Sequence, residues 1–229
     1  MTKQEWLASR DLHSMLRFLE GRTSPRKLRL FAAACCRYIW DSIGDERSQQ
    51  VVELLELYAD QLLPREVFLA ARQAAVEIAF AAPTKGPCAL REATKEPPFE
   101  AAMTTFEYVV SVAADHLVEQ SERVKLGIIS WDAAKSIYRP QVYADLANFL
   151  RDIVPYQNRE PTTSPSWQTD DVQAVARRIY QQYRFEDLPI LADALEEAGV
   201  DDEEMLAHCR NGHSHVRGCW VVDLVLGKE

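Results

Sequence analysis

The side chains best suited to chemistry are concentrated in one stretch, A-H-C-R-N-G-H-S-H-V-R-G-C-W, at residues 207–220. It holds three of the five histidines and two of the five cysteines of the chain. Imidazole nitrogens and thiolate sulfurs are donors that zinc prefers, and a structural zinc site takes four donors in a tetrahedron. The stretch is therefore the best candidate for a metal site in this sequence.

The spacing limits which of these residues can share an ion. His208 and Cys209 are neighbours, and on a helix their side chains point about 100° apart, so both rarely bind one metal. Cys209, either His213 or His215, and Cys219 then give three ligands, and a fourth must come from elsewhere. The spacing also differs from that of the common zinc fingers. The metal hypothesis is a zinc site drawn from Cys209, His213, His215 and Cys219, and zinc is the one cofactor that the sequence suggests.

A purely structural interpretation explains much of the same stretch, and we prefer it. Asn211-Gly212 is a good helix stop, and His208 and Arg210 suit the negative end of a helix dipole. Cys209 and Cys219 can be small buried apolar groups. The stretch then serves as the turn that joins two helices.

A cysteine nucleophile is the weakest of the three hypotheses. Cys209 or Cys219 beside His215 could form an activated thiolate. The sequence offers no oxyanion-hole motif, no Gly-rich turn before either cysteine and no orienting partner beyond Asp223. We therefore assign no catalytic residue, and the sequence favours a protein that is not an enzyme.

Composition indicates the elements that must position these residues. The chain has 229 residues, of which 47% are hydrophobic and 8 are glycine. Abundant Ala and Leu favour helices, and alternating β-branched runs with Asn-Gly hairpins are almost missing. We expect an all-α fold, a compact bundle of nine to eleven helices.

Helical periodicity, caps and Pro or Gly signals give the expected segments. Asp11, Ser24-Pro25, Asp45 and Pro64 mark the first helix starts. The C-terminal segment has high β propensity, but no second strand is evident to pair with it, so we expect a helix there too. The expected helices are 12–20, 25–43, a third from 45, a fourth from 64, one of about five turns from 99, then 131–153, 170–183, 187–198, 202–210 (capped by Asp201) and the segment 216–226; residues 83–98 are expected to be a loop.

The expected organisation has two helical regions. Residues 1–153 form an N-terminal region and residues 170–229 a C-terminal one, packed together as one body. Between them, residues 154–169 read V-P-Y-Q-N-R-E-P-T-T-S-P-S-W-Q-T, a Pro/Ser/Thr-rich linker or loop.

The charge distribution bears on partners. The formal net charge is −9, which disfavours general nucleic-acid binding. Residues 1–40 nevertheless hold eight Lys or Arg and three Asp or Glu, and residues 185–229 hold eleven acids and three bases. Arg22, Arg26 and Arg29 share one helix face, so a nucleic-acid-binding regulator is kept as an alternative, although the acidic balance of the chain disfavours nucleic acid as a partner.

Location follows from what the sequence does not contain. There is no signal-peptide pattern and no apolar run of about 20 residues, so we expect no membrane association. The five cysteines are an odd number, and reduced thiols in a cytoplasm are the expectation.

Both ends of the chain resemble one protein family. The N-terminal motifs are E-W-L (5–7), R-K-L-R-L-F-A-A-A-C-C-R-Y-I-W (26–40) and D-E-R-S (45–48). The C-terminal motifs are L-R-D-I (150–153), L-P-I-L-A-D-A-L-E-E-A-G (188–199) and H-V-R-G-C-W-V-V-D-L-V-L-G-K (215–228). These runs resemble an uncharacterised family of helical bacterial proteins found mainly in planctomycetes, and the resemblance implies no activity.

The sequence as a whole favours a non-enzymatic, cytoplasmic protein-interaction or accessory module. Helical core patterning runs through the chain, no catalytic set is complete, and the uneven charge suits docking to a protein partner. The partner and the oligomeric state are not indicated.

Overall fold

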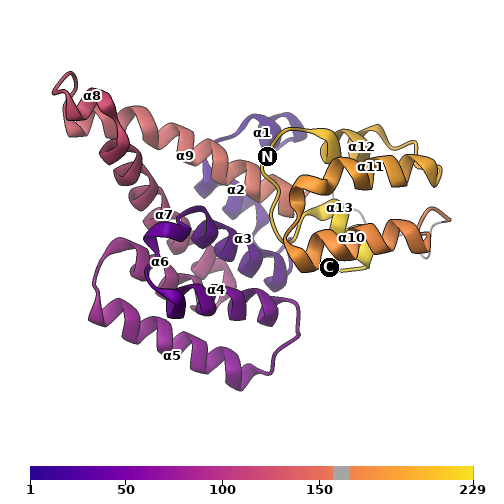
Figure 1. The fold of residues 1–229 in the computed structure, drawn as a ribbon, viewed down its shortest axis with the longest axis horizontal. Coiled ribbons are helices and arrows are strands. Elements are labelled where there is room, and N and C mark those ends of the chain that lie inside the picture. The colour runs from indigo at the N-terminus through magenta and orange to yellow at the C-terminus, as the bar shows by residue number, and fades with distance from the viewer. Residues whose placement is uncertain (157–165, 229) are drawn as a thin grey trace. The chain divides into compact units, whose positions relative to one another are not determined.

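A computed structural model describes residues 1–156 and 166–228, and every regular element in these ranges is helical (Figure 1). The all-α prediction is confirmed. The described residues form thirteen α-helices and two short 3-10 helices, more than the nine to eleven expected. The excess comes from short helices that periodicity detects poorly. None of the described helices is long and apolar enough to cross a membrane.

The contacts divide the chain into two compact units, Met1–Ala147 and Asn148–Glu229. The division falls inside one long helix, α9 (Trp131–Ile153), rather than in the Pro-rich segment. Most of the linker expected at 154–169 lies outside the described residues, which leave out 157–165.

Helix α3 is the central element of the first unit. It begins as predicted, with the Ser24 side chain accepting a hydrogen bond from the Lys27 amide and Pro25 in the first turn. Residues 30–36 are all buried, and α3 contacts α4, α6 and α7. The helix ends at Tyr38 and not near residue 43, because a 3-10 turn, η1, follows it.

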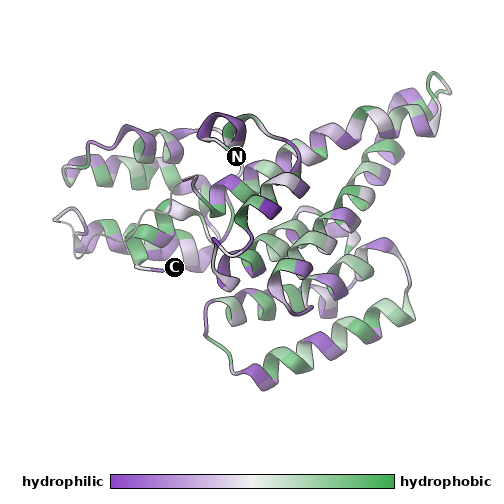
Figure 2. Ribbon diagram, turned by 180° about the vertical axis from the view of Figure 1, so that it is seen from behind, coloured by the Kyte–Doolittle hydropathy of each residue, from purple (hydrophilic) through white to green (hydrophobic). Residues whose placement is uncertain are grey.

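The first unit contains α1 (Lys3–Ala8), α2 (Leu12–Leu19), α3 (Pro25–Tyr38), η1 (Trp40–Ser42), α4 (Glu46–Ala59), α5 (Arg65–Ala81), α6 (Lys85–Ala93), α7 (Pro98–Gln120), α8 (Glu122–Lys125) and α9 up to residue 147. Figure 2 shows hydrophobic residues recurring among hydrophilic ones along these helices, as amphipathic helices require.

The prediction of a loop over residues 83–98 is wrong, because α6 (Lys85–Ala93) forms inside it. Pro87 lies in the first turn of α6, where backbone N–H groups have no partner within the helix, so the helix loses no hydrogen bond there. Gly86 meets the backbone at the end of η1: a Cβ there would lie 2.0 Å from the Ser42 carbonyl oxygen. Gly86 and Pro87, two of the Gly and Pro residues that suggest a loop in the sequence, therefore lie in the first turn of a packed helix.

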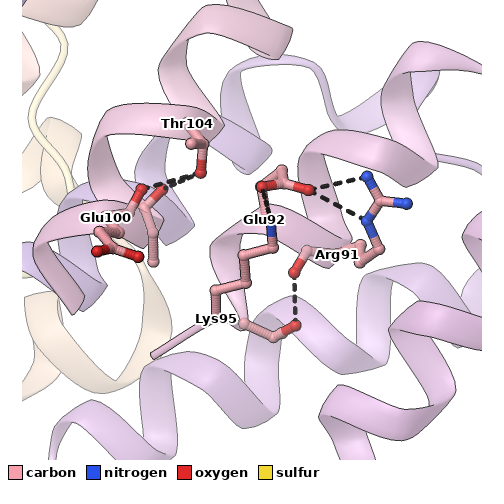
Figure 3. Close-up of polar contacts among 7 residues, drawn as sticks. Arg91, Glu92, Lys95, Glu100 and Thr104 are labelled. Carbon is pink, nitrogen blue, oxygen red and sulfur yellow. Dashed lines mark hydrogen bonds and ion pairs between the residues drawn. The ribbon is translucent and has the colours of Figure 1, made fainter. Parts of the chain in front are cut away.

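The last turn of α6 contains a buried carboxylate, that of Glu92. Glu92 is 3% exposed, and it accepts hydrogen bonds from Arg91 Nη2 at 2.9 Å and from the Lys95 ammonium (Figure 3). Burial opposes its ionisation, but these two partners outweigh burial and hold the pKa of Glu92 below its ordinary value. Both cations lie within three residues of Glu92, so the pairing is local to the end of α6 and the turn after it.

In its described residues, the second unit has the end of α9 and four further α-helices around its own core. Val172, Ile179, Leu191, Met205 and Val222 are among its buried residues. The expected cap of the 202–210 helix is wrong by one residue: Asp202, and not Asp201, accepts from the Met205 amide at 3.0 Å. Its elements are α10 (Asp170–Gln182), η2 (Phe185–Asp187), α11 (Leu188–Glu197), α12 (Glu203–Arg210) and α13 (Trp220–Leu226).

The helix expected in the last segment is confirmed as α13, although its sequence is rich in valine. Val221, Val222 and Val225 are buried, and α13 contacts α10 and α12. Tertiary packing therefore overrides the β propensity of the segment.

Gly86→Ala tests the close approach of α6 to η1. The added methyl group must displace backbone, so we expect a loss of about 1–3 kcal/mol in the free energy of unfolding. Gly212→Ala is the matched control, because a Cβ at Gly212 meets nothing within 4 Å. Urea unfolding followed by circular dichroism measures both, and equal stability of the two variants would contradict the packing described.

Candidate functional site

The carboxylate of Asp152, one residue before the end of α9, is the centre of the candidate site. The residue is 3% exposed. Its Oδ1 lies 3.0 Å from His208 Nε2 and 2.6 Å from His215 Nδ1, and its Oδ2 accepts the Val216 amide at 2.8 Å. Because a carboxylate only accepts, these contacts require N–H groups on the ring nitrogens that face it. Asp152 therefore joins the end of α9 to α12 and to the segment that follows it.

Local structure brings the other three side chains to this carboxylate. His208 lies in the last turn of α12, and His215 lies in the connection between α12 and α13. Cys219 immediately precedes α13. The turn before it uses Gly218 at φ +95°, in the region that favours glycine.

The donor atoms of four residues converge on one another. His208 Nε2 lies 3.4 Å from Cys219 Sγ as well as 3.0 Å from Asp152 Oδ1. One ligand atom from each of Asp152, His208, His215 and Cys219 lies within 4.8 Å of all the others. The ring centroids of His208 and His215 are 4.9 Å apart. The arrangement is therefore a set of possible metal ligands from three separate segments of the second unit.

The pKa of the carboxyl group and the pKa values of the thiols are shifted in opposite directions. Burial raises the pKa of Asp152, but hydrogen bonds from His208 and His215 outweigh it, and the net pKa lies below the ordinary value. Burial raises the pKa of Cys219 well above that of a free thiol, and the charge of Asp152 adds to the effect. Burial likewise raises the pKa of Cys209 to about 12. Without a metal ion, the carboxylate is ionised and both thiols are protonated at neutral pH.

The geometry does not suit a cysteine nucleophile. In a catalytic relay, one nitrogen of the imidazole takes the proton of the nucleophile while the carboxylate holds the other nitrogen. Here the same atom, His208 Nε2, faces both Cys219 Sγ and Asp152 Oδ1. Cys219 is also fully buried. Convergence on a shared point is typical of metal ligands and not of a proton relay.

The structure brings together two of the four residues expected to bind zinc, His215 and Cys219. Cys209 is buried in the core of the second unit, and His213 is exposed, with its amide bonded to Asn211 Oδ1 at 3.1 Å. Of the adjacent pair, it is His208 and not Cys209 whose position on the helix directs it to the cluster.

Asp152 was missed because it lies far from the cluster in sequence. One signal could have found it. Asp152 stands beside Leu150, Ile153 and Val154 at the buried end of α9, and a carboxylate among apolar residues requires partners. This pattern indicates that Asp152 needs hydrogen-bond donors, but it does not identify the residues that provide them.

The arginines considered for nucleic-acid binding are mostly engaged inside the first unit. Arg26 pairs with Asp60 at 2.9 Å, and Arg29 is 6% exposed and pairs with Glu96 at 3.0 Å. Arg22 is exposed, with its guanidinium 4.6 Å from the centre of the Phe18 ring. Two of the three cations are thus neutralised by the fold itself.

Comparisons with protein-family models, with curated proteins and with solved structures found no match. The resemblance to a planctomycete family therefore stays a prediction.

Asp152→Asn tests the carboxylate as the centre of this network. The side-chain amide that replaces the carboxylate places an N–H₂ group against the donors that Asp152 accepts from. We therefore expect the free energy of unfolding of the second unit to fall by about 1–3 kcal/mol. The Val216 amide should also exchange its hydrogen faster. Asp193→Asn removes a carboxylate that is 69% exposed and pairs with Arg210, and it should cost less than about 1 kcal/mol. Unchanged Val216 protection in Asp152→Asn would contradict the assignment.

Thiol labelling tests the burial of the cysteines. Cys88 is half-buried, whereas the other four cysteines are buried. We expect an alkylating reagent to modify Cys88 first in the folded chain and Cys35, Cys36, Cys209 and Cys219 only on unfolding, because the thiolate is the reactive form. Peptide mass spectrometry gives the order of labelling, and rapid native labelling of Cys219 would contradict the buried site.

Proposed function

We propose that this protein is a non-enzymatic interaction or accessory module that docks to a protein partner through the tip between α8 and α9. The tip exposes three large apolar side chains within six residues: Leu126 at 71%, Ile128 at 61% and Trp131 at 42%. Isolated exposed hydrophobic residues are common, but a contiguous group of them is typical of an interaction site. Its partner would offer an apolar pocket or groove.

The tip is a structured turn, which supports a role in docking. The Gly127 amide donates to the Val124 carbonyl at 2.9 Å, and the Ile128 amide donates to the Arg123 carbonyl at 2.8 Å. These backbone bonds hold the turn while its apolar side chains face outwards. In Figure 2 the tip is the hydrophobic loop at the upper right.

Contacts between α7 and α9 fix the base of the tip. Tyr138 on α9 donates to the Ser121 hydroxyl at 3.1 Å. Asp115 on α7 pairs with Lys85 at 2.6 Å and with Lys135 of α9 at 2.5 Å. A turn held in this way presents Trp131 and its neighbours at a low entropic cost of binding.

The cysteines support the non-enzymatic role and the cytoplasmic location in this proposal. Cys209 and Cys219 are buried and protonated in the metal-free chain, which makes them poor nucleophiles. All five cysteines are free thiols, as suits a protein of the reducing cytoplasm.

A photo-cross-linking residue at position 128 tests the proposal in the native host. We expect one or a few adducts of defined mass from position 128 and none from position 62, where Leu62 is 62% exposed elsewhere on the same unit. The substitutions Leu126→Ser and Trp131→Ser, added together, should abolish the adduct without changing the helical content. No adduct at 128, or equal adducts at 62 and 128, would contradict the proposal.

A further inference from the structure

We propose that Asp152, His208, His215 and Cys219 bind a single zinc ion that acts as a structural metal of the second unit. The proposal stands independently of the docking role of the tip. It also replaces two of the ligands expected from the sequence, Cys209 and His213.

The distances among the donor atoms fit one tetrahedral ion. Zinc–nitrogen and zinc–oxygen bonds of about 2.0–2.1 Å and a zinc–sulfur bond of about 2.3 Å place neighbouring ligand atoms about 3.3–3.6 Å apart. His208 Nε2 lies 3.0 Å from Asp152 Oδ1 and 3.4 Å from Cys219 Sγ, and all four donor atoms lie within 4.8 Å of one another. Asp152 Oδ1 and His215 Nδ1 lie only 2.6 Å apart, so these two atoms must move apart when the ion binds.

The type and charge of the donors favour zinc. Two imidazoles, one thiolate and one carboxylate are ligands that zinc accepts together, whereas calcium and magnesium prefer oxygen alone. Ionised Asp152 and Cys219 carry two negative charges between them, and a divalent ion brings the buried centre to a net charge of zero. A buried site without net charge avoids the large free energy of placing an unpaired charge in the interior.

The surroundings of the ligands also fit a metal. The Val216 amide holds Asp152 Oδ2 at 2.8 Å, which turns Oδ1 towards His208 and His215. Backbone support of this kind orients the ligands of metal sites. Binding of the ion would release protons, because Cys219 binds as a thiolate and His208 and His215 bind as neutral imidazoles through a nitrogen without a proton.

The position of the site gives the ion a structural task. Four ligands from the protein complete a tetrahedron, as in structural zinc sites. The ligands come from the end of α9, the last turn of α12, the connection after it and the residue before α13. Helix α13 has only seven residues and no side-chain hydrogen bond at its N-cap. The ion would fix its start in place of a cap.

Metal analysis of the full-length, untagged wild-type chain tests the proposal first. After incubation with zinc and extensive dialysis, we expect one zinc per chain by elemental analysis. Cobalt in place of zinc should give the visible bands of a tetrahedral ion and one thiolate-to-cobalt charge-transfer band. Less than a tenth of an equivalent of zinc, or cobalt bound without thiolate, would overturn the proposal.

Substitutions then identify the ligands. Cys219→Ser should remove the charge-transfer band, and His208→Ala should weaken zinc binding at least about 100-fold, since even supporting residues change metal affinity by 10–100-fold. Cys209→Ala and His213→Ala are matched controls, adjacent in sequence to the site but outside the cluster, and they should leave zinc affinity unchanged. Circular dichroism verifies that each variant keeps its helices. Loss of zinc from Cys209→Ala or His213→Ala with retention in His208→Ala would show that this ligand set is wrong.

Discussion

The hydrogen bonds of the buried Asp152 carboxylate are the contacts that join α12 and the connection after it to the end of α9. An ionised carboxylate in an apolar surrounding is destabilising by several kcal/mol unless its oxygens are paired. Asp152 meets this requirement with two imidazoles and one backbone amide, and these donors come from α12 and from the connection between α12 and α13. Separation of these segments would leave the charge unpaired, so this side chain fixes α12 and the connection after it against the end of α9.

The same requirement brings His208 and His215 together, and Cys219 Sγ lies 3.4 Å from His208 Nε2. A single nitrogen that faces both a thiol and a carboxylate cannot relay a proton between them, but it can share an ion with them. Asp152 and Cys219 are buried and His208 and His215 are partly buried, whereas large apolar side chains at the tip of the first unit are exposed. The proposed accessory role rests on the exposed apolar turn, and the proposed metal centre rests on the cluster around Asp152.

Most of the fold could be predicted from the sequence, because caps and helical periodicity are local. Ser24-Pro25, Asp45 and the apolar face of α10 place their helices well. Helix α6 could not be predicted, because the use of Gly86 depends on backbone from η1 that only the fold brings close. Three of the four residues of the cluster, His208, His215 and Cys219, lie in the stretch from 207 to 220 that the sequence singles out. The choice between His208 and Cys209 depends on the rotation of α12. Asp152 joins the site across 56 residues of chain from His208, and no spacing rule covers that distance.

X-ray absorption at the zinc edge on the zinc-loaded full-length chain is the most direct test of the metal centre built on Asp152. The account predicts one sulfur neighbour at about 2.3 Å and three nitrogen or oxygen neighbours at about 2.0–2.1 Å. Two sulfur neighbours would mean that Cys209 is a ligand with Cys219, and an absence of sulfur would mean that zinc binds elsewhere. Either result would contradict a centre formed by Asp152, His208, His215 and Cys219.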